Sequence, residues 1–281
     1  MTAQMRVSEW MSLAAFGWLI ALGWARQGLG GARRGKIVVY GAIGVAAILV
    51  PALLLPRMLA PLAASVVRDW APYILLFVFY SQAGLFVTRS DAWLEAKLLE
   101  IDQRLVAPPV ACFAHRTTGR WILAYLELAY MAYYVALPGA MAALYLAGRR
   151  AAVDRFWAVA LLGEYLSCAT LPYVQTRPPR ALAEKWSECL PASRLRAFNW
   201  WILRRGSIQA NTFPSAHVAL ATSCALILLK LAPVWVGVVF LWTAISIAGG
   251  AVAGRYHYGA DAVLGFLTGG LAYLVGAALA T

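Results

Sequence analysis

Charged residues are scarce in this chain, and so are the side chains that bind metals or form disulfides. Only 13% of the 281 residues are charged and 62% are hydrophobic, whereas an ordinary soluble domain is about 25% charged. This composition excludes a water-soluble globule, which needs many polar side chains on its surface, and it excludes a disordered chain. The four cysteines form no CxxC pair and no cluster with histidine. A zinc site or a disulfide framework is therefore not expected.

Long apolar runs take the place of the missing charge. Eight of them approach the length of about 20 residues that a membrane-spanning helix needs. They cover residues 10–25, 37–55, 70–88, 121–146, 156–174, 213–229, 234–253 and 260–280. We therefore predict an all-α fold, a polytopic transmembrane helix bundle of about eight spans. Small residues four apart in the last runs, such as Gly265 and Gly269, predict close packing of helix backbones.

Two connecting segments are longer than turns, and both predict interfacial amphipathic structure. Residues 91–106 read as a helix with an apolar stripe, which suits a position in the membrane interface. The stripe consists of Leu94, Leu98, Ile101 and Leu105. Residues 175–211 are basic and contain Trp186, Trp200 and Trp201, a combination typical of the headgroup level.

The charge of the chain is strongly basic. It has 24 Lys and Arg against 12 Asp and Glu, a formal net charge of +12. Because these cations lie between apolar runs, they indicate contact with lipid headgroups. We expect membrane lipids around the protein, an anionic substrate at the membrane surface, and no nucleic-acid partner.

Two of the three histidines stand where apolar runs begin, in connections that two crossings bring to the same side of the membrane. His217 ends a Phe-Pro-Ser-Ala-His stretch, and His257 precedes Asp261 by four residues, which places them on one helical face. An aspartate bonded to one ring nitrogen leaves the other nitrogen basic. We predict His257, His217 and Asp261 as catalytic residues.

Groups suited to a phosphate surround these histidines. Guanidinium groups match phosphate oxygens, and free backbone N–H groups at a helix start bind anions. We predict Arg177, Arg180, Ser215 and Arg255 as phosphate-binding residues. The chain offers no carboxylate cluster for a divalent cation, so we expect no metal and no cofactor. The combination favours phosphoryl transfer through a phosphohistidine, although each motif alone would indicate only packing or a helix start.

Glu127 and Glu164 lie within predicted spans. We interpret them as hydrogen-bonded to tyrosine or backbone groups inside the bundle, and the alternative is a wall of the substrate cavity.

The motifs together resemble the signature of the type 2 phosphatidic acid phosphatase (PAP2) superfamily. The stretches that carry the resemblance are Arg177-Pro178, Pro214-Ser215-Ala216-His217 and His257 through Asp261. Their residue pattern is similar to that of the inositolphosphorylceramide-synthase-like branch. The resemblance implies a six-helix core in a catalytic membrane domain of residues 70–281, with residues 1–69 as transmembrane helices outside it.

The resemblance also implies a role for each matched residue. His257 would be the nucleophile, Asp261 its orienting partner and His217 the proton donor to the leaving oxygen, while Ser215 and Arg177 would hold the phosphate. Two cations of the signature are missing, because Thr170 and Ala251 stand in their places. We expect Arg180 to offset the first and Arg255, one helical turn from Ala251, to replace the second.

These observations predict an integral membrane lipid phosphatase that hydrolyses a lipid or isoprenoid phosphomonoester. Two alternatives stay open: a lipid phosphotransferase that uses inositol or another alcohol, and an inactive lipid-binding or transport protein. The resemblance implies an extracytoplasmic catalytic face of a multi-pass membrane protein. The positive-inside rule predicts the opposite, because most Lys and Arg lie in the connections on that side. We adopt the orientation of the family, and the sequence does not indicate an oligomeric state.

Overall fold

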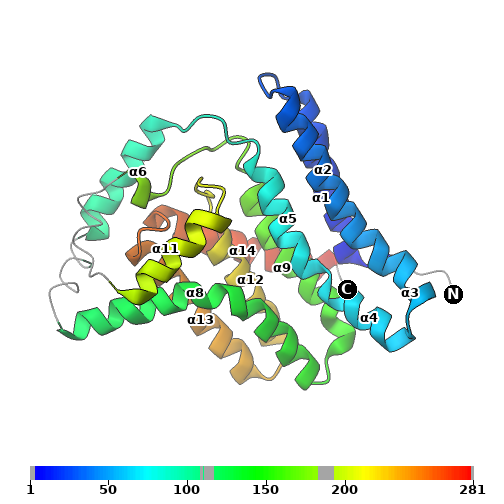
Figure 1. Ribbon diagram of the computed structural model, residues 1–281. Helices are drawn as coiled ribbons and strands as arrows, with labels where there is room; N and C mark the ends of the chain where they lie inside the picture. The colour runs from blue at the N-terminus through cyan, green and yellow to red at the C-terminus, as the bar shows by residue number, and fades with distance from the viewer. Residues whose placement is uncertain (1–3, 108–109, 111–116, 183–192, 280–281) are drawn as a thin grey trace.

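The computed structural model describes residues 4–107, 110, 117–182 and 193–279, and within these residues it is helical without a β-strand. Figure 1 shows the arrangement. The α-helices are α1 (Val7–Ala25), α2 (Gly31–Leu49), α3 (Leu55–Met58), α4 (Pro61–Trp70), α5 (Pro72–Gly84), α6 (Ala92–Leu105), α8 (Thr117–Leu146), α9 (Val153–Cys168), α11 (Arg194–Gly206), α12 (Ala216–Leu231), α13 (Val234–Ala253) and α14 (Gly259–Leu279). Short turns of other helix types are η1 (Val50–Leu54), η2 (Arg150–Ala152) and η3 (Pro179–Ala181). The prediction of an all-α fold is confirmed.

Six helical segments of the described residues are long and apolar enough to cross a membrane. They are Val7–Ala25, Gly31–Met58, Pro61–Gly84, Thr118–Leu146, Val234–Ala253 and Gly259–Leu279. The remaining two predicted runs correspond to α9 and α12, which have 16 residues each. These two helices are shorter because α9 ends at Cys168, before the polar loop, and α12 begins only after Pro214. The polytopic bundle is confirmed, and the number of spans stays a prediction.

Helix α12 lies at the centre of the bundle, where it packs against α8, α9, α13 and α14. Glycines on α14 permit the close approach of α12. A Cβ added at Gly265 would lie 2.8 Å from Cβ of Val218, and one added at Gly269 would lie 2.6 Å from the carbonyl oxygen of Ala219. As predicted, these glycines serve helix packing.

The N-terminal helices are tied to the rest of the bundle at one end by charged groups. Helix α1 packs against α2 and α9, and α2 packs against α5. Asp69 accepts hydrogen bonds from Arg6 at 2.6 Å, from Tyr145 at 2.6 Å and from Arg150 at 2.8 Å. Because such pairs are costly to leave incomplete when buried, this network fixes α1 to α4 and α8. The domain boundary between residues 69 and 70 stays a prediction.

Helix α6 confirms the helix predicted over residues 91–106, but its buried face is not the apolar stripe. The buried side chains are Glu95, Leu98 and Asp102, whereas Ile101 is 45% exposed and Leu105 is 71% exposed. The polar stripe faces the protein because both carboxylates meet arginine-bearing loops, as described below. The outer face combines Ile101 and Leu105 with the exposed charges of Lys97, Glu100 and Arg104, a mixture that suits a helix in the membrane interface.

Helix α11 occupies part of the second predicted interfacial segment. Phe198 and Trp201 are each 47% exposed on it, and their rings stack 5.8 Å apart. Arg205 lies over the Trp201 ring at 4.6 Å. Aromatic and basic groups on one exposed surface are typical of the headgroup level. Trp186 lies outside the described residues.

Candidate active site

Three loops that are far apart in the sequence are joined by backbone hydrogen bonds at one end of the bundle. Thr176, in the loop after α9, pairs with Asn211, just before α12, in an antiparallel bridge whose N–H···O distance is 2.8 Å. Arg180 N donates to the carbonyl oxygen of Arg255 at 3.0 Å, which connects the same loop to the α13–α14 turn. The structure therefore brings all the predicted motifs to one place.

His257 and Asp261 form the predicted pair. Nδ1 of His257 lies 3.3 Å from Oδ2 of Asp261. The same carboxylate oxygen accepts hydrogen bonds from the side chain of Asn211 at 2.8 Å and from the backbone N–H of Tyr258 at 2.9 Å. Since Asp261 is fully buried, these donors fix the carboxylate and leave Nε2 of His257 as the ring nitrogen directed away from it.

His257 is held in its neutral form. It precedes α14 and is 6% exposed. Burial lowers the pKa of His257 to about 3, and the positive charge of Arg180 adds to the shift. A neutral imidazole has a free electron pair on Nε2, which is the property a nucleophile needs.

His217 faces His257 from the first turn of α12. The ring centroids of the two histidines are 5.5 Å apart and their planes make an angle of 59°. The His217 ring packs against Tyr133 at 4.2 Å and stacks on Tyr130 at 5.2 Å. Tyr130 also stacks on Tyr256, from the loop that carries His257. This aromatic packing fixes the second imidazole beside the first.

Ser215 is the N-cap residue of α12. Its Oγ accepts from the backbone N–H of Val218 at 3.5 Å, and its own N–H donates to the carbonyl oxygen of Asp261 at 3.1 Å. The side chain is fully buried. Ser215 therefore begins the helix and joins it to α14. Its predicted contact with phosphate stays a prediction.

Arg177 is clamped by a carboxylate from α6. Glu95 accepts hydrogen bonds from Nε of Arg177 at 3.1 Å, from Nη2 at 2.8 Å and from the backbone N–H at 2.7 Å. Burial alone would raise the pKa of Glu95, but the hydrogen bonds from Arg177 outweigh it and lower that pKa. The Arg177 side chain is 50% exposed while that of Glu95 is 3% exposed. One edge of the guanidinium is thus fixed, and the group still reaches solvent.

Arg255 meets the second carboxylate of α6. Its Nη1 lies 3.6 Å from Oδ2 of Asp102, whose Oδ1 accepts from the backbone N–H of Gly259 at 2.9 Å. The expectation that Arg255 lies one helical turn beyond Ala251 is wrong. Helix α13 ends at Ala253, and Arg255 has a φ of 65°, in the left-handed region. The helix closes there because the backbone N–H groups that follow Arg255 donate to the carbonyl oxygen of Ala251.

Arg180 is the predicted cation whose charge acts on His257. Its Nη1 lies 3.4 Å from the carbonyl oxygen of Tyr256, and its guanidinium carbon is 5.9 Å from the centroid of the Tyr256 ring. The side chain also interacts with Tyr80 and Tyr134, and burial lowers the pKa of Arg180. Arg180 therefore stands beside His257.

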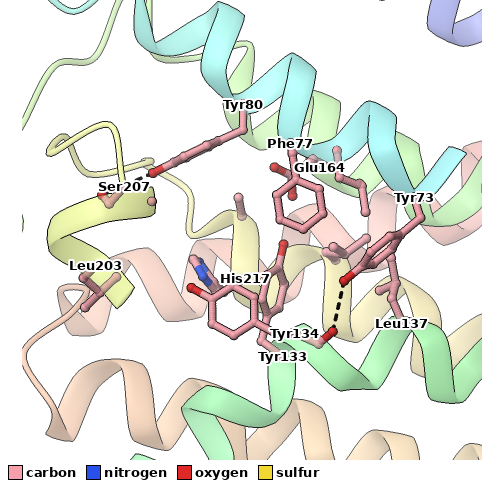
Figure 2. Close-up of a pocket in the computed structure, with 14 residues that line it drawn as sticks. Tyr73, Phe77, Tyr80, Tyr133, Tyr134, Leu137, Glu164, Leu203, Ser207 and His217 are labelled. Carbon is pink, nitrogen blue, oxygen red and sulfur yellow. Dashed lines mark hydrogen bonds between the residues drawn. The ribbon is translucent and has the colours of Figure 1, made fainter. Parts of the chain in front are cut away.

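A cavity of about 80 Å³ lies against His217, between α5, α8, α9, α11 and α12. Figure 2 shows His217 at this cavity together with a group of tyrosines. Glu164 lines it and is also hydrogen-bonded to Tyr133, as the first interpretation predicts, and a part in substrate binding stays a prediction. Glu127 follows the first interpretation, because its Oε2 accepts from the hydroxyl of Tyr256 and from the side chain of Asn199, both at 2.6 Å.

Sequence reasoning missed Asn211 and the partners that α6 supplies. Glu95 and Asp102 are seven residues apart, a spacing that puts both on one helix face and could have identified them as a pair of buried carboxylates. Nothing in the sequence around Asn211 distinguishes it from a turn residue. Within the described part of the chain, no group of three or more His, Cys, Asp or Glu is placed to hold a metal ion.

Comparison with known proteins gives one match. Residues 96–275 match the family model described as the PAP2 superfamily. This range runs from α6 into α14 and contains every predicted site residue, while Glu95 directly precedes it. No curated protein matches the chain, and no solved structure matches it.

Proposed function

The chain belongs to the PAP2 superfamily, and from this premise we propose that it is an integral membrane lipid phosphatase that hydrolyses a lipid or isoprenoid phosphomonoester through a phosphohistidine on His257. One observation carries the proposal. The two imidazoles face each other with their centroids 5.5 Å apart, and the inner one is bonded to a buried carboxylate. An acid–base group and an oriented nucleophile around one phosphorus atom are what such a reaction needs.

Each imidazole has a separate task. Nε2 of His257 attacks the phosphorus, and the P–O bond to the alcohol breaks as His217 gives its proton to the leaving oxygen. In the second step water attacks the phosphohistidine, His217 takes the proton of that water, and phosphate leaves as the His257–phosphorus bond breaks. Positioned proton transfer of this kind contributes about 10²–10⁴ in rate.

Arg180 and Arg177 are the side chains best placed to bind the phosphate oxygens. Arg180 lies beside both histidine-bearing loops, and Arg177 has one edge fixed by Glu95 while its side chain stays half exposed. A donor aimed at the developing charge is worth roughly 3–4 kcal/mol. The contact of Arg255 with phosphate stays a prediction, since its side chain is 3% exposed and lies at Asp102.

The proposal is tested with the purified full-length protein in detergent, incubated with phosphatidic acid, a ceramide phosphate and an isoprenoid monophosphate, each with and without inositol and a chelator. Release of free phosphate at a rate that the chelator does not change is the expected result. A new lipid product that forms only when the alcohol is present would show that the protein is a phosphotransferase and not a phosphatase. Lipid binding without either product would favour the inactive lipid-binding alternative.

We also propose that the catalytic face is extracytoplasmic, as the family resemblance implies.

A further inference from the structure

The cavity beside His217 is built as a binding site for something largely apolar. Five helices enclose it, and most of its lining is aromatic or aliphatic, as at Phe77, Leu137 and Leu220. A concave apolar site with a few polar groups is the usual form of a small-molecule site. Figure 2 shows the tyrosines of α5 and α8 on two sides of it.

The place of His217 determines which part of a substrate meets this cavity. In a phosphoryl transfer the leaving oxygen lies opposite the attacking atom. With His257 as the nucleophile and His217 as the proton donor, the leaving oxygen and its carbon chain lie on the side of His217. The cavity is lined by His217 and not by the phosphate-binding Arg177, so it faces the alcohol part of the substrate.

Glu164 contributes a carboxyl group to the cavity wall. It comes from α9 and is 3% exposed. Its Oε1 accepts a hydrogen bond from Sγ of Cys168 at 3.3 Å, and the side chain of Tyr133, which also packs on His217, forms a second hydrogen bond with the carboxyl group. A carboxyl group inside a membrane bundle is costly and is a functional candidate by default. Because a thiol is a weak donor, the carboxyl group keeps hydrogen-bonding capacity toward the cavity.

The hydroxyl groups of two lining tyrosines already have partners in the protein. The hydroxyl of Tyr73 donates to the carbonyl oxygen of Tyr134 at 3.1 Å. The hydroxyl of Tyr80 lies 3.4 Å from Oγ of Ser207 and accepts from the backbone N–H of Ile208 at 3.2 Å. These tyrosines therefore present mainly their rings to an occupant, and Glu164 presents an acceptor.

We propose that this cavity binds the alcohol part of the lipid substrate and that Glu164 accepts a hydrogen bond from a hydroxyl group that the alcohol carries next to the phosphoester. The inference rests on the proposed function and adds a specificity-determining residue to it. The substrate class is a lipid phosphate with an apolar chain and a free hydroxyl near the phosphate, preferred over an isoprenoid phosphate that lacks one.

The test compares two probes, a monoacylglycerol phosphate, which has a free hydroxyl next to the phosphoester, and farnesyl monophosphate, which has none. Phosphate release is measured for the full-length protein in detergent and for Glu164→Leu, Glu164→Gln and Ser167→Ala. Ser167 is a buried residue of α9 that does not line the cavity, so it is the matched control. Glu164→Leu is expected to lower kcat/KM for the hydroxyl-bearing probe about 10–100-fold and to change that for farnesyl monophosphate less than about 3-fold.

An equal loss with both probes, or no loss with either, overturns the inference. If Glu164→Leu does not yield folded protein, Glu164→Gln decides, and an unchanged ratio of the two kcat/KM values overturns the inference as well. Failure of the proposed function itself looks different, because the unsubstituted protein would then release no phosphate from any probe.

Discussion

At the scale of single residues, the site depends on a buried carboxylate that is fixed before any substrate arrives. Asp261 accepts hydrogen bonds from the side chain of Asn211 and from the backbone N–H of Tyr258, and it in turn orients His257. Burial and the charge of Arg180 lower the pKa of His257 to about 3. His257 is therefore unprotonated throughout the physiological pH range, the state that the proposed nucleophile needs.

The first prediction concerns the titration of His257. Because its pKa in the folded protein lies well below the ordinary value, His257 gains no proton as the pH falls from 8 to 5. The protein is labelled with [13C-ε1]histidine in detergent, and the His257 resonance is assigned from its absence in His257→Gln. We expect that resonance to stay at the position of neutral imidazole over the whole range. A titration with a midpoint between pH 6 and 7 would contradict the prediction.

At the scale of secondary-structure elements, α6 holds the arginine-bearing loops in place through ion pairs. Its two inward carboxylates contact Arg177 and Arg255, and Asp102 also binds the first N–H of α14. Two ion pairs from one helix connect it to the loop after α9 and to the α13–α14 turn. An element of this kind positions binding groups without touching the reacting atoms.

The second prediction tests Glu95 as a positioning residue for Arg177. Glu95→Gln removes the charge that fixes the guanidinium, so KM for a lipid phosphate rises about 10-fold, kcat changes less, and the inhibition constant of inorganic phosphate rises in parallel. Glu100→Gln is the matched control, because Glu100 pairs only with exposed cations of the same helix, Lys97 and Arg104, among the contacts described for it. Both variants are assayed by initial rates in detergent. Tighter binding of phosphate by Glu95→Gln would show that Glu95 competes with the substrate instead.

The third prediction concerns the packing of α12 against α14. A Cβ at position 269 would meet the Ala219 carbonyl oxygen at 2.6 Å, whereas one at position 270 would meet nothing within 4 Å. Gly269→Ala is therefore expected to lower the free energy of unfolding by about 1–3 kcal/mol, and Gly270→Ala is expected to be neutral or slightly stabilising. Thermal unfolding in the same detergent compares the two. Equal melting temperatures for both variants would contradict the close contact of these helices.

The sequence predicted the features that depend on local pattern. Apolar runs located the helices, and motif spacing located His217, His257 and Asp261, which the structure brings together. Features that depend on contacts between distant segments were not accessible, such as the hydrogen bond from Asn211 to Asp261. The same holds for the inward polar face of α6, since an apolar stripe does not reveal that its carboxylates have arginine partners.

At the scale of the whole molecule, charge and family resemblance point to opposite orientations. The site end of the bundle carries the arginine-bearing loops, α6 and the basic helix α11. The positive-inside rule assigns such an end to the cytoplasm. Several of these cations have other partners, however, because Arg177 and Arg255 lie in ion pairs with α6 and Arg180 lies beside His257. The charge count at this end therefore reflects the site as well as the topology.

The fourth prediction tests the proposed extracytoplasmic face. Single cysteines are introduced at Lys97, on the exposed side of α6, and at Arg149, beyond the far end of α8, in a chain whose four native cysteines are replaced by serine. A membrane-impermeant maleimide applied to intact cells should label position 97 and leave position 149 unlabelled until the membrane is opened. Labelling of position 149 alone would reverse the orientation and leave the chemistry of the site unaffected.

Trapping the covalent phosphohistidine tests most directly whether His257 is the nucleophile. The purified protein is mixed with a lipid phosphate labelled with 32P at its phosphate, quenched in alkali within milliseconds to seconds, and examined for protein-bound label. We expect acid-labile, alkali-stable label that is absent from His257→Gln and that forms more slowly in His217→Gln, where the first step lacks its acid. Undiminished label or undiminished phosphate release in His257→Gln would contradict the assignment of His257 as the nucleophile.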